Sequence, residues 1–127
     1  MKKNLKLEEL EVYKVAMEIG ETVWNIVIKW DYFQKRTLGA QLVDAADSIA
    51  FNIAEGYGRF HYKDNKNFCY YSRGSAKETL TGLTKAKKRS LIAEEEFTLC
   101  NERFTLYFRL MFGYINSIGQ SPDDSKE

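Results

Sequence analysis

The sequence predicts an all-α protein, an antiparallel up-down-up-down four-helix bundle. Apolar residues recur at spacings of three and four along most of the chain, which is the period of a helix that buries one face. The only proline is Pro122, so no proline interrupts a helix before it. Short connections between long helices favour antiparallel neighbours. We therefore expect one four-helix domain over residues 1–120 and a disordered polar tail over residues 121–127.

The first predicted helix runs from about Glu8 to about Trp30. A polar turn from Asp31 to Arg36 separates it from the second, which ends near Glu55. There we expect Gly56 to stop the helix, because glycine enters the left-handed backbone region without strain. The two apolar stripes that define these helices are Val12, Ala16, Ile19, Val23, Ile26, Val27 and Trp30, and then Leu38, Leu42, Ala45, Ala46, Ile49 and Ile53.

The third predicted helix carries a stripe rich in small side chains. Gly74 and Gly82 lie beside this stripe. Small side chains let two helices approach closely, so we expect a neighbouring backbone to pack against Gly74 and Ser75. The stripe consists of Phe68, Ser72, Ser75, Ala76, Thr79, Leu83 and Ala86.

The fourth predicted helix begins after Ala93. Glu94, Glu95 and Glu96 fill its first turn and complement the positive end of the helix dipole. Its core face consists of Phe97, Cys100, Phe104, Tyr107, Phe108, Met111, Tyr114, Ile115 and Ile118. The chain has more apolar side chains than one small bundle buries, which predicts an interface. This excess comprises Leu99, Leu106, Leu110, Trp24, Trp30, Phe33 and Phe51.

The overall composition points to no particular class of partner. The chain has 19 Lys and Arg against 18 Asp and Glu, a formal charge of +1. No apolar stretch is long enough to span a bilayer, so we expect a cytoplasmic protein without membrane contact. Cys69 and Cys100 belong to no metal-ligand pattern. Free thiols are the simplest expectation in a reducing cytoplasm, and a disulfide between them stays open at this stage.

The strongest local feature is basic charge along the third predicted helix. Between Arg59 and Arg89, nine bases and two acids give a local charge of +7. The bases are Arg59, Lys63, Lys66, Arg73, Lys77, Lys85, Lys87, Lys88 and Arg89, and aromatic residues among them are Tyr57, Phe60, His61, Tyr62, Tyr70 and Tyr71. Cations can contact phosphates while rings stack on unpaired bases. A merely solvated helix face is the alternative, and the charge pattern alone favours it.

The charge balance reverses in the last part of the chain. From Ile92 to Glu127, seven acids and three bases give −4. Opposite signs on the third and fourth predicted helices suit a self-complementary oligomer as well as a surface that binds a polyanion.

No catalytic apparatus emerges from the sequence. Asn52 and Glu55 lie about one turn apart and could serve as an amide and a general base, but no second catalytic group accompanies them. We instead expect a structural polar network of Asn52, Glu55, Ser75 and Glu78. His61 is the only histidine. No Glu-x-x-His pair and no P-loop occur, so we expect no metal, no cofactor, no small-molecule substrate and no enzyme activity.

Several segments carry a resemblance to one family. These are residues 46–59, with the run Ser-Ile-x-x-Asn-Ile-Ala-Glu-Gly, the pair Gly74-Ser75, Glu78, and residues 7–13 and 88–97. The chain resembles the bacterial four-helix bundle proteins known as the 23S rRNA intervening-sequence protein family. The resemblance implies a homopentamer of largely unassigned role. It also implies similarity in fold to the accessory variability determinants of diversity-generating retroelements, which bind a reverse transcriptase and nucleic acid through a basic surface.

The chain departs from that family at three places. Val43-Asp44 stands where relatives commonly have a basic pair, Ala50 stands where they often have proline, and Asn65 replaces an aromatic residue. The lost basic pair weakens the transfer of RNA binding to this chain. It does not affect the expected fold.

We therefore expect a non-enzymatic oligomer, a homopentamer, that binds RNA, DNA or a nucleic-acid enzyme through the third predicted helix. The expected contacts are the nine bases given above and Tyr62. The alternative is a structural or scaffolding homo-oligomer that has a protein partner and does not bind nucleic acid.

Overall fold

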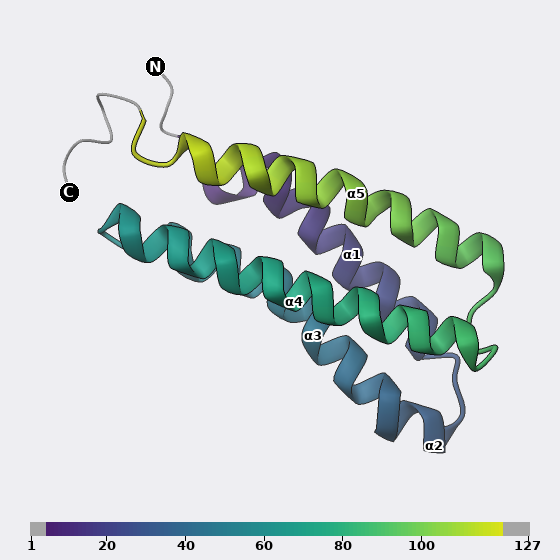
Figure 1. The fold of residues 1–127 in the computed structure, drawn as a ribbon. Coiled ribbons are helices and arrows are strands. Elements are labelled where there is room, and N and C mark those ends of the chain that lie inside the picture. The colour runs from purple at the N-terminus through teal and green to yellow at the C-terminus, as the bar shows by residue number, and fades with distance from the viewer. Residues whose placement is uncertain (1–4, 121–127) are drawn as a thin grey trace.

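The computed structural model describes residues 5–120, and four long helices packed against one another make up most of this range (Figure 1). They are α1 (Glu11–Val27), α3 (Ala40–Tyr57), α4 (Tyr62–Lys88) and α5 (Glu94–Ser117). α1 and α4 each pack against α3 and α5, and no strand occurs among the described residues. The predicted antiparallel four-helix bundle is confirmed. The predicted tail, residues 121–127, lies outside the described range.

The first helix is shorter than predicted. Leu7–Glu9 form a separate 3₁₀ turn, and α1 ends at Val27. Trp30 lies beyond the helix and is buried, with its indole Nε1 donating a hydrogen bond to the Leu91 carbonyl oxygen at 3.0 Å. The prediction of Trp30 as part of an exposed interface is therefore wrong. Its hydrogen bond instead connects the segment after α1 to the turn between α4 and α5.

The predicted polar turn after the first helix is itself helical. Asp31 caps the short helix α2 (Tyr32–Gln34): Asp31 Oδ1 accepts from the Gln34 backbone N–H at 3.0 Å, and Gln34 Oε1 accepts from the Asp31 N–H at 3.3 Å. A π-helical segment, Lys35–Gly39, then leads directly into α3. A Cβ atom at Gly39 would lie 2.8 Å from Val27 Cγ1, so this glycine lets α1 and the start of α3 approach closely.

Gly56 does not stop α3 in the predicted way. It is helical, and the capping residue Gly58 has φ −79°, so neither glycine uses the left-handed region. A Cβ atom at Gly56 would lie 2.8 Å from Phe68 Cβ and 3.0 Å from the Asn65 carbonyl oxygen. The glycine is needed because α3 and α4 approach each other closely at this point.

The expected close packing at Gly74 and Ser75 is also wrong. Gly74 is exposed, and a Cβ atom there would have no neighbour within 4 Å. Ser75 is half-buried, and its carbonyl oxygen accepts a hydrogen bond from Thr79 Oγ1 at 2.7 Å. The close approach on this helix occurs at Gly82, where a Cβ atom would lie 2.6 Å from Leu42 Cδ1.

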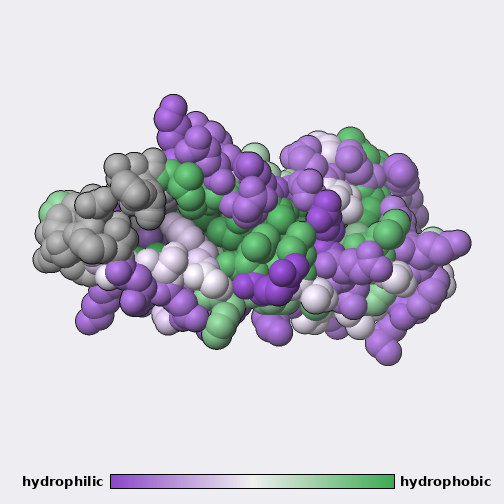
Figure 2. Space-filling view, turned by 90° about the horizontal axis from the view of Figure 1, so that it is seen from above, coloured by the Kyte–Doolittle hydropathy of each residue, from purple (hydrophilic) through white to green (hydrophobic). Residues whose placement is uncertain are grey.

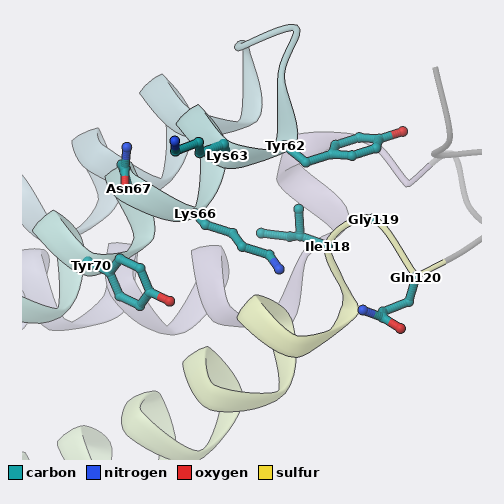
Figure 3. A pocket seen from close by; sticks show the side chains of 8 residues that line it. All are labelled: Tyr62, Lys63, Lys66, Asn67, Tyr70, Ile118, Gly119 and Gln120. Atoms are coloured by element: carbon teal, nitrogen blue, oxygen red, sulfur yellow. The ribbon is translucent and has the colours of Figure 1, made fainter. Parts of the chain in front are cut away.

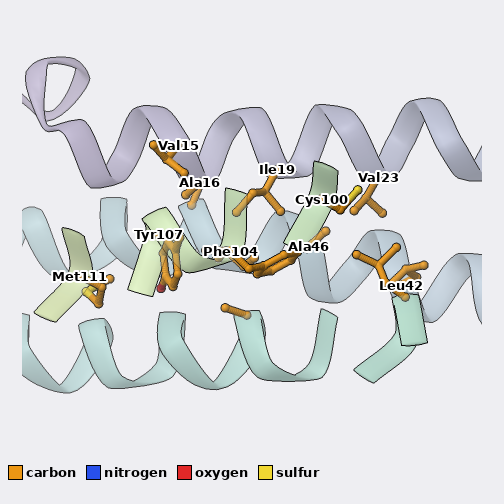
Figure 4. Packing of buried hydrophobic residues seen from close by; sticks show 14 of the residues in the cluster. Val15, Ala16, Ile19, Val23, Leu42, Ala46, Cys100, Phe104, Tyr107 and Met111 are labelled. Carbon is orange, nitrogen blue, oxygen red and sulfur yellow. The ribbon is translucent and has the colours of Figure 1, made fainter. Parts of the chain in front are cut away.

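The core runs along the bundle axis and contains the predicted stripes of α1 and α3. Figure 4 shows Phe104 and Tyr107 of α5 in the interior, among side chains of α1 and α3. The buried side chains that α5 contributes are Cys100, Phe104, Tyr107, Met111 and Ile115. The whole predicted core face of the fourth helix is therefore buried or packed against the core, as expected.

The two cysteines are both free and buried. Ser72 of α4 contacts Tyr107 of α5. In this antiparallel pair Cys69 and Cys100 lie in opposite directions from that contact, about 15 Å apart along the axis. A disulfide needs Cα atoms within about 7 Å, so the alternative of a bridge between them does not hold in this fold.

Candidate nucleic-acid interface

The nine predicted basic residues are spread along the full length of α4. A helix of 27 residues is about 40 Å long, so the nine residues form a row and not one compact site. Three of them stand near the start of the helix, and we call these the N-terminal basic group: Arg59, Lys63 and Lys66. Four follow at its end, the C-terminal basic group: Lys85, Lys87, Lys88 and Arg89. Arg73 and Lys77 lie between the two groups.

The C-terminal basic group is positioned by a tight turn between α4 and α5. Ser90 has φ 60°, the Leu91 N–H donates to the Ala86 carbonyl at 2.8 Å, and the Ser90 N–H donates to the Lys87 carbonyl at 3.1 Å. This is the hydrogen-bond pattern of a Schellman motif. It brings the acidic first turn of α5 next to the end of α4.

Within this group Lys87 is already engaged by α5. Its Nζ lies 3.2 Å from Glu94 Oε2 and 4.7 Å from the centre of the Phe97 ring. The other three members form no ion pair with any residue that the structure describes. The acidic residues of α5 therefore neutralise this end of the row only in part.

In the N-terminal basic group, Arg59 has internal partners. Its Nη2 lies 2.8 Å from Glu55 Oε2, and its guanidinium carbon lies 4.7 Å from the Phe68 ring centre. Lys63 and Lys66 instead line a cavity of about 450 Å³ between the start of α4 and the segment that follows α5 (Figure 3). The other lining residues are Tyr62, Asn67, Tyr70, Ile118, Gly119 and Gln120.

The two cations in the middle of the row lie over aromatic rings. The Arg73 guanidinium carbon is 5.0 Å from the Tyr70 ring centre, and Lys77 Nζ is 4.4 Å from the ring centre of Phe108 on α5. Such contacts stabilise a cation without removing its positive charge. Both side chains are exposed and remain able to attract an anion.

The aromatic residues predicted to stack on bases have different surroundings. The Tyr57 hydroxyl donates to the Leu5 carbonyl oxygen, and the Phe60 and His61 rings contact each other edge to face at 4.9 Å. Tyr71 contacts Phe68 in the same way at 5.3 Å. Of the six predicted residues, Tyr62 and Tyr70 line the cavity.

A comparison with known families identifies the chain. The model of the 23S rRNA-intervening sequence protein family matches residues 8–113. The chain belongs to this family. The resemblance that the sequence motifs indicated is therefore confirmed, and the match covers all four long helices except the last residues of α5.

Solved structures show a relative with the same fold. One crystal structure is of a protein with unknown function from the S23 ribosomal protein family of Bacteroides thetaiotaomicron VPI-5482. The similarity has a TM-score of 0.76 at 22% sequence identity, and it covers 83% of this chain and 95% of that chain. No curated protein matches the chain significantly. At this identity the structural likeness establishes the fold alone.

The predicted polar network is not joined up in this intervening-sequence family member. Asn52 Nδ2 donates to the Ser48 carbonyl oxygen at 2.9 Å, and Glu55 pairs with Arg59. Ser75 and Glu78 lie on α4. Within residues 5–120 no hydrogen bond or ion pair links any two of Asn52, Glu55, Ser75 and Glu78.

The buried polar contacts of this family member lie elsewhere and were missed by sequence reasoning. Ser72 and Tyr107 share a hydrogen bond of 2.6 Å, and both side chains are fully buried. Burial raises the pKa of Tyr114 to about 12, although a hydrogen bond with Asn65 opposes that rise. The available signal was that Ser72 and Tyr107 both stand on predicted core stripes, where a polar atom needs a partner.

Several of the apolar side chains that were predicted to exceed the core lie on the surface. Figure 2, a view onto α5, shows apolar surface along the middle of the molecule with polar surface around it. The large apolar residues that are about half exposed or more include Trp24, Phe33, Phe51, Leu99 and Phe112. Leu106 and Leu110 are half-buried and pack against the core.

A second hollow, of about 480 Å³, lies between α1 and α3. Trp24, Ile28 and Val43 contribute apolar surface to it, and Asp44 and Asp47 are also part of its lining. Burial raises the pKa of Asp47, and the nearby carboxylates of Glu21 and Asp44 raise it further. The Val43-Asp44 pair thus lies in this hollow, which does not include any residue of α4.

Residues 5–120 contain neither a metal-binding cluster nor a membrane-spanning helix. No group of three or more side chains there could hold a metal ion. In the same range no helix is both long enough and apolar enough to cross a membrane.

Proposed function

We propose that this protein is a non-enzymatic oligomer that binds RNA, DNA or a nucleic-acid enzyme through the basic row of α4. The observation that supports it most directly is that most of the positive charges along the row have no acidic partner in residues 5–120. Within the described residues, ion pairs engage only two of the nine cations, Arg59 and Lys87. An uncompensated positive row about 40 Å long attracts a polyanion over its whole length.

The departure from the family's basic pair does not weaken this surface directly. Val43 and Asp44 belong to α3 and line the hollow shared with α1. The charge that is missing there would have acted on the α1 and α3 side of the bundle. The row on α4 keeps its own charge and its aromatic neighbours.

Assembly into a homo-oligomer is the second part of the proposal. Exposed Trp24, Phe51, Leu99 and Phe112 are large apolar side chains that a monomer leaves in water. Such residues are typical of interfaces between subunits when they form patches. The pentameric state follows from the family resemblance.

The alternative function is a structural or scaffolding homo-oligomer with a protein partner. The contact between Lys87 and Glu94 favours it, because basic and acidic helices that pair within one subunit can also pair between subunits. In this case the basic residues of α4 would pair with acidic residues of neighbouring subunits. The oligomer would then have no affinity for nucleic acid.

A titration at several salt concentrations tests the proposal. Full-length protein, with its mass measured by light scattering, is titrated into labelled structured RNA and duplex DNA. We expect binding that weakens steeply with salt, because phosphate contacts release counterions. No binding by the intact oligomer at low salt would contradict the proposal and favour the scaffold.

Charge neutralisation locates the contacts. Converting Lys85, Lys87, Lys88 and Arg89 to Gln together should abolish binding if the C-terminal basic group carries it. A matched control removes the same charge from bases outside the row, with Lys14, Lys29, Lys35 and Arg36 converted to Gln. Equal affinity of the two variants would contradict the assignment to this end of α4.

A further inference from the structure

The cavity beside the first turns of α4 has the features of a discrete ligand site. Its volume of about 450 Å³ lies within the roughly 300–1,000 Å³ of small-molecule sites. Figure 3 shows Lys66 extending from α4 toward the segment that holds Gln120, while Lys63 and Asn67 lie on the other side of the helix. No carboxylate belongs to the lining.

The side of the cavity opposite α4 is formed by the segment after α5, which turns at Gly119. Gly119 has φ 79°, in the left-handed region that favours glycine, and it turns the chain after α5. A Cβ atom at this position would lie 3.2 Å from Tyr62 Cδ2, so the turn packs directly on the Tyr62 ring. Ile118 is buried and anchors the segment, and Gln120 follows the turn at the edge of the cavity.

The polar side chains of the cavity are available to a ligand. Within residues 5–120 no hydrogen bond or ion pair engages the side chains of Lys63, Lys66, Asn67 or Gln120. Lysine ammonium groups bind phosphate as point charges, and a glutamine amide offers both a donor and an acceptor to a base edge. Tyr70 adds an aromatic ring that is 44% exposed.

We infer that this cavity binds one unpaired nucleotide of a nucleic-acid strand. Lys66 contacts its phosphate, the base stacks on Tyr70, and Gln120 contacts the base edge. The inference rests on the proposed function and deepens it. It assigns the N-terminal end of the basic row to the recognition of single-stranded nucleic acid.

The rest of the row gives the strand a path away from the cavity. Arg73 and Lys77 follow Lys66 by seven and eleven residues, or about 10 and 16 Å along the helix axis. Arg73 lies over the Tyr70 ring, and Lys77 lies over Phe108, so both are held along the same helix. A base within a duplex cannot enter the cavity unless it leaves its stack.

The experiment compares single-stranded and duplex probes on full-length protein. The probes are fluorescently labelled 12-nucleotide oligouridine and oligodeoxythymidine, and blunt 12-base-pair RNA and DNA duplexes. Fluorescence anisotropy at fixed salt gives each affinity. UMP and AMP are titrated separately, because a free nucleotide has the same phosphate and base as a nucleotide in a strand.

Two neighbouring tyrosines provide a matched pair of variants. Tyr70→Leu removes the ring that lines the cavity, whereas Tyr71→Leu removes an exposed ring that contacts Phe68 outside it. We expect Tyr70→Leu to weaken binding of the single strands about tenfold. The affinity of Tyr70→Leu for the duplexes should stay unchanged. Tyr71→Leu should bind both single strands and duplexes as tightly as the wild type. Gln120→Ala, at an exposed position, should also weaken single-strand binding selectively.

The outcomes separate this inference from the proposed function. If Tyr70→Leu and Gln120→Ala leave the single-strand affinity unchanged while duplexes still bind, the cavity assignment is wrong and the proposed function stands. If wild-type protein binds no probe, both are wrong. If UMP or AMP binds as tightly as the oligonucleotides and depends on Tyr70, a free nucleotide is the ligand, and the assignment to a strand is overturned.

Discussion

Tyr107 of α5 donates a hydrogen bond to Ser72 of α4 across the centre of the core. The two oxygens are 2.6 Å apart, and Ser72 Oγ in turn lies 2.8 Å from the Ile49 carbonyl oxygen of α3. A serine hydroxyl has one hydrogen, which it donates to Ile49, so the hydrogen between Ser72 and Tyr107 belongs to Tyr107. One buried chain of hydrogen bonds thus connects three helices.

The direction of these hydrogen bonds predicts unequal effects of two substitutions. Ser72→Ala leaves the buried Tyr107 hydroxyl without its acceptor and should lower the free energy of unfolding by about 1–3 kcal/mol. Tyr107→Phe leaves Ser72 bonded to Ile49 and should cost about 0.5–1.5 kcal/mol. Urea denaturation of the two single variants and the double variant measures both losses in the free energy of unfolding. A larger loss in Tyr107→Phe would show that the assigned donor is wrong.

Glycines at two positions of the α3 and α4 pair predict opposite effects of alanine. At Gly56 a Cβ atom would lie 3.0 Å from the Asn65 carbonyl oxygen, which cannot move without shifting α4. We expect Gly56→Ala to lower the free energy of unfolding by about 1–3 kcal/mol. At Gly74 the space is open, so Gly74→Ala should raise it by roughly 0.5–1 kcal/mol through helix propensity.

Thermal and urea unfolding of both alanine variants checks this pair. Each variant is the control for the other, because the chemical change is the same and only the surroundings differ. A gain in stability at Gly56 would mean that α3 and α4 can separate there at little cost.

The sequence predicted the bundle because burial alone decides which face of a helix turns inward. The stripes of α1 and α3, from Val12 to Val27 and from Leu38 to Ile53, are buried as expected. The glycines show where periodicity is insufficient. Whether Gly56 ends a helix or admits a neighbour depends on where Phe68 lies, and no local pattern contains that information.

The candidate site was predictable only in part for the same reason. The charges along α4 are a property of one helix, and the sequence shows them directly. The cavity needs Gln120 to return beside Lys66, which the antiparallel packing of α4 and α5 and the turn at Gly119 bring about. The position of Trp30 was unpredictable for the same reason, because the Leu91 carbonyl that it bonds is 61 residues away in the chain.

Buried groups on α4 and α5 predict a loss of stability in alkaline solution. Burial raises the pKa of Cys69 from its ordinary value of 9.0 to about 12, and it raises the pKa of Tyr114 to about 12. The unfolded chain therefore loses these protons at lower pH than the folded chain does. Stability is fully present below about pH 9 and falls as the pH rises toward 12, by about 1.4 kcal/mol per pH unit for each group.

Cys69→Ala tests which group begins this loss. The variant lowers stability at pH 8 because it removes a buried side chain, but between pH 9 and 10 its free energy of unfolding should fall less steeply with pH than that of the wild type. Urea denaturation at pH 8, 9, 9.5 and 10 gives the slopes. Identical slopes would show that the Cys69 thiol ionises equally in the folded and unfolded states.

Asp47 predicts a pH effect of the same sign in a lower pH range, because its protonated form is the one that the folded state favours. Burial raises the pKa of its carboxyl group above the ordinary 3.8, and Glu21 and Asp44 raise it further. Its charged form is therefore unfavourable in the folded state at neutral pH, and Asp47→Asn should raise the melting temperature at pH 7. The gain should shrink as the pH falls through the raised pKa and vanish below about 3.8, where both states hold the proton. Glu102→Gln, on the exposed face of α5, removes the same charge and serves as the control. An equal gain in both variants would assign the effect to net charge alone and not to the surroundings of Asp47.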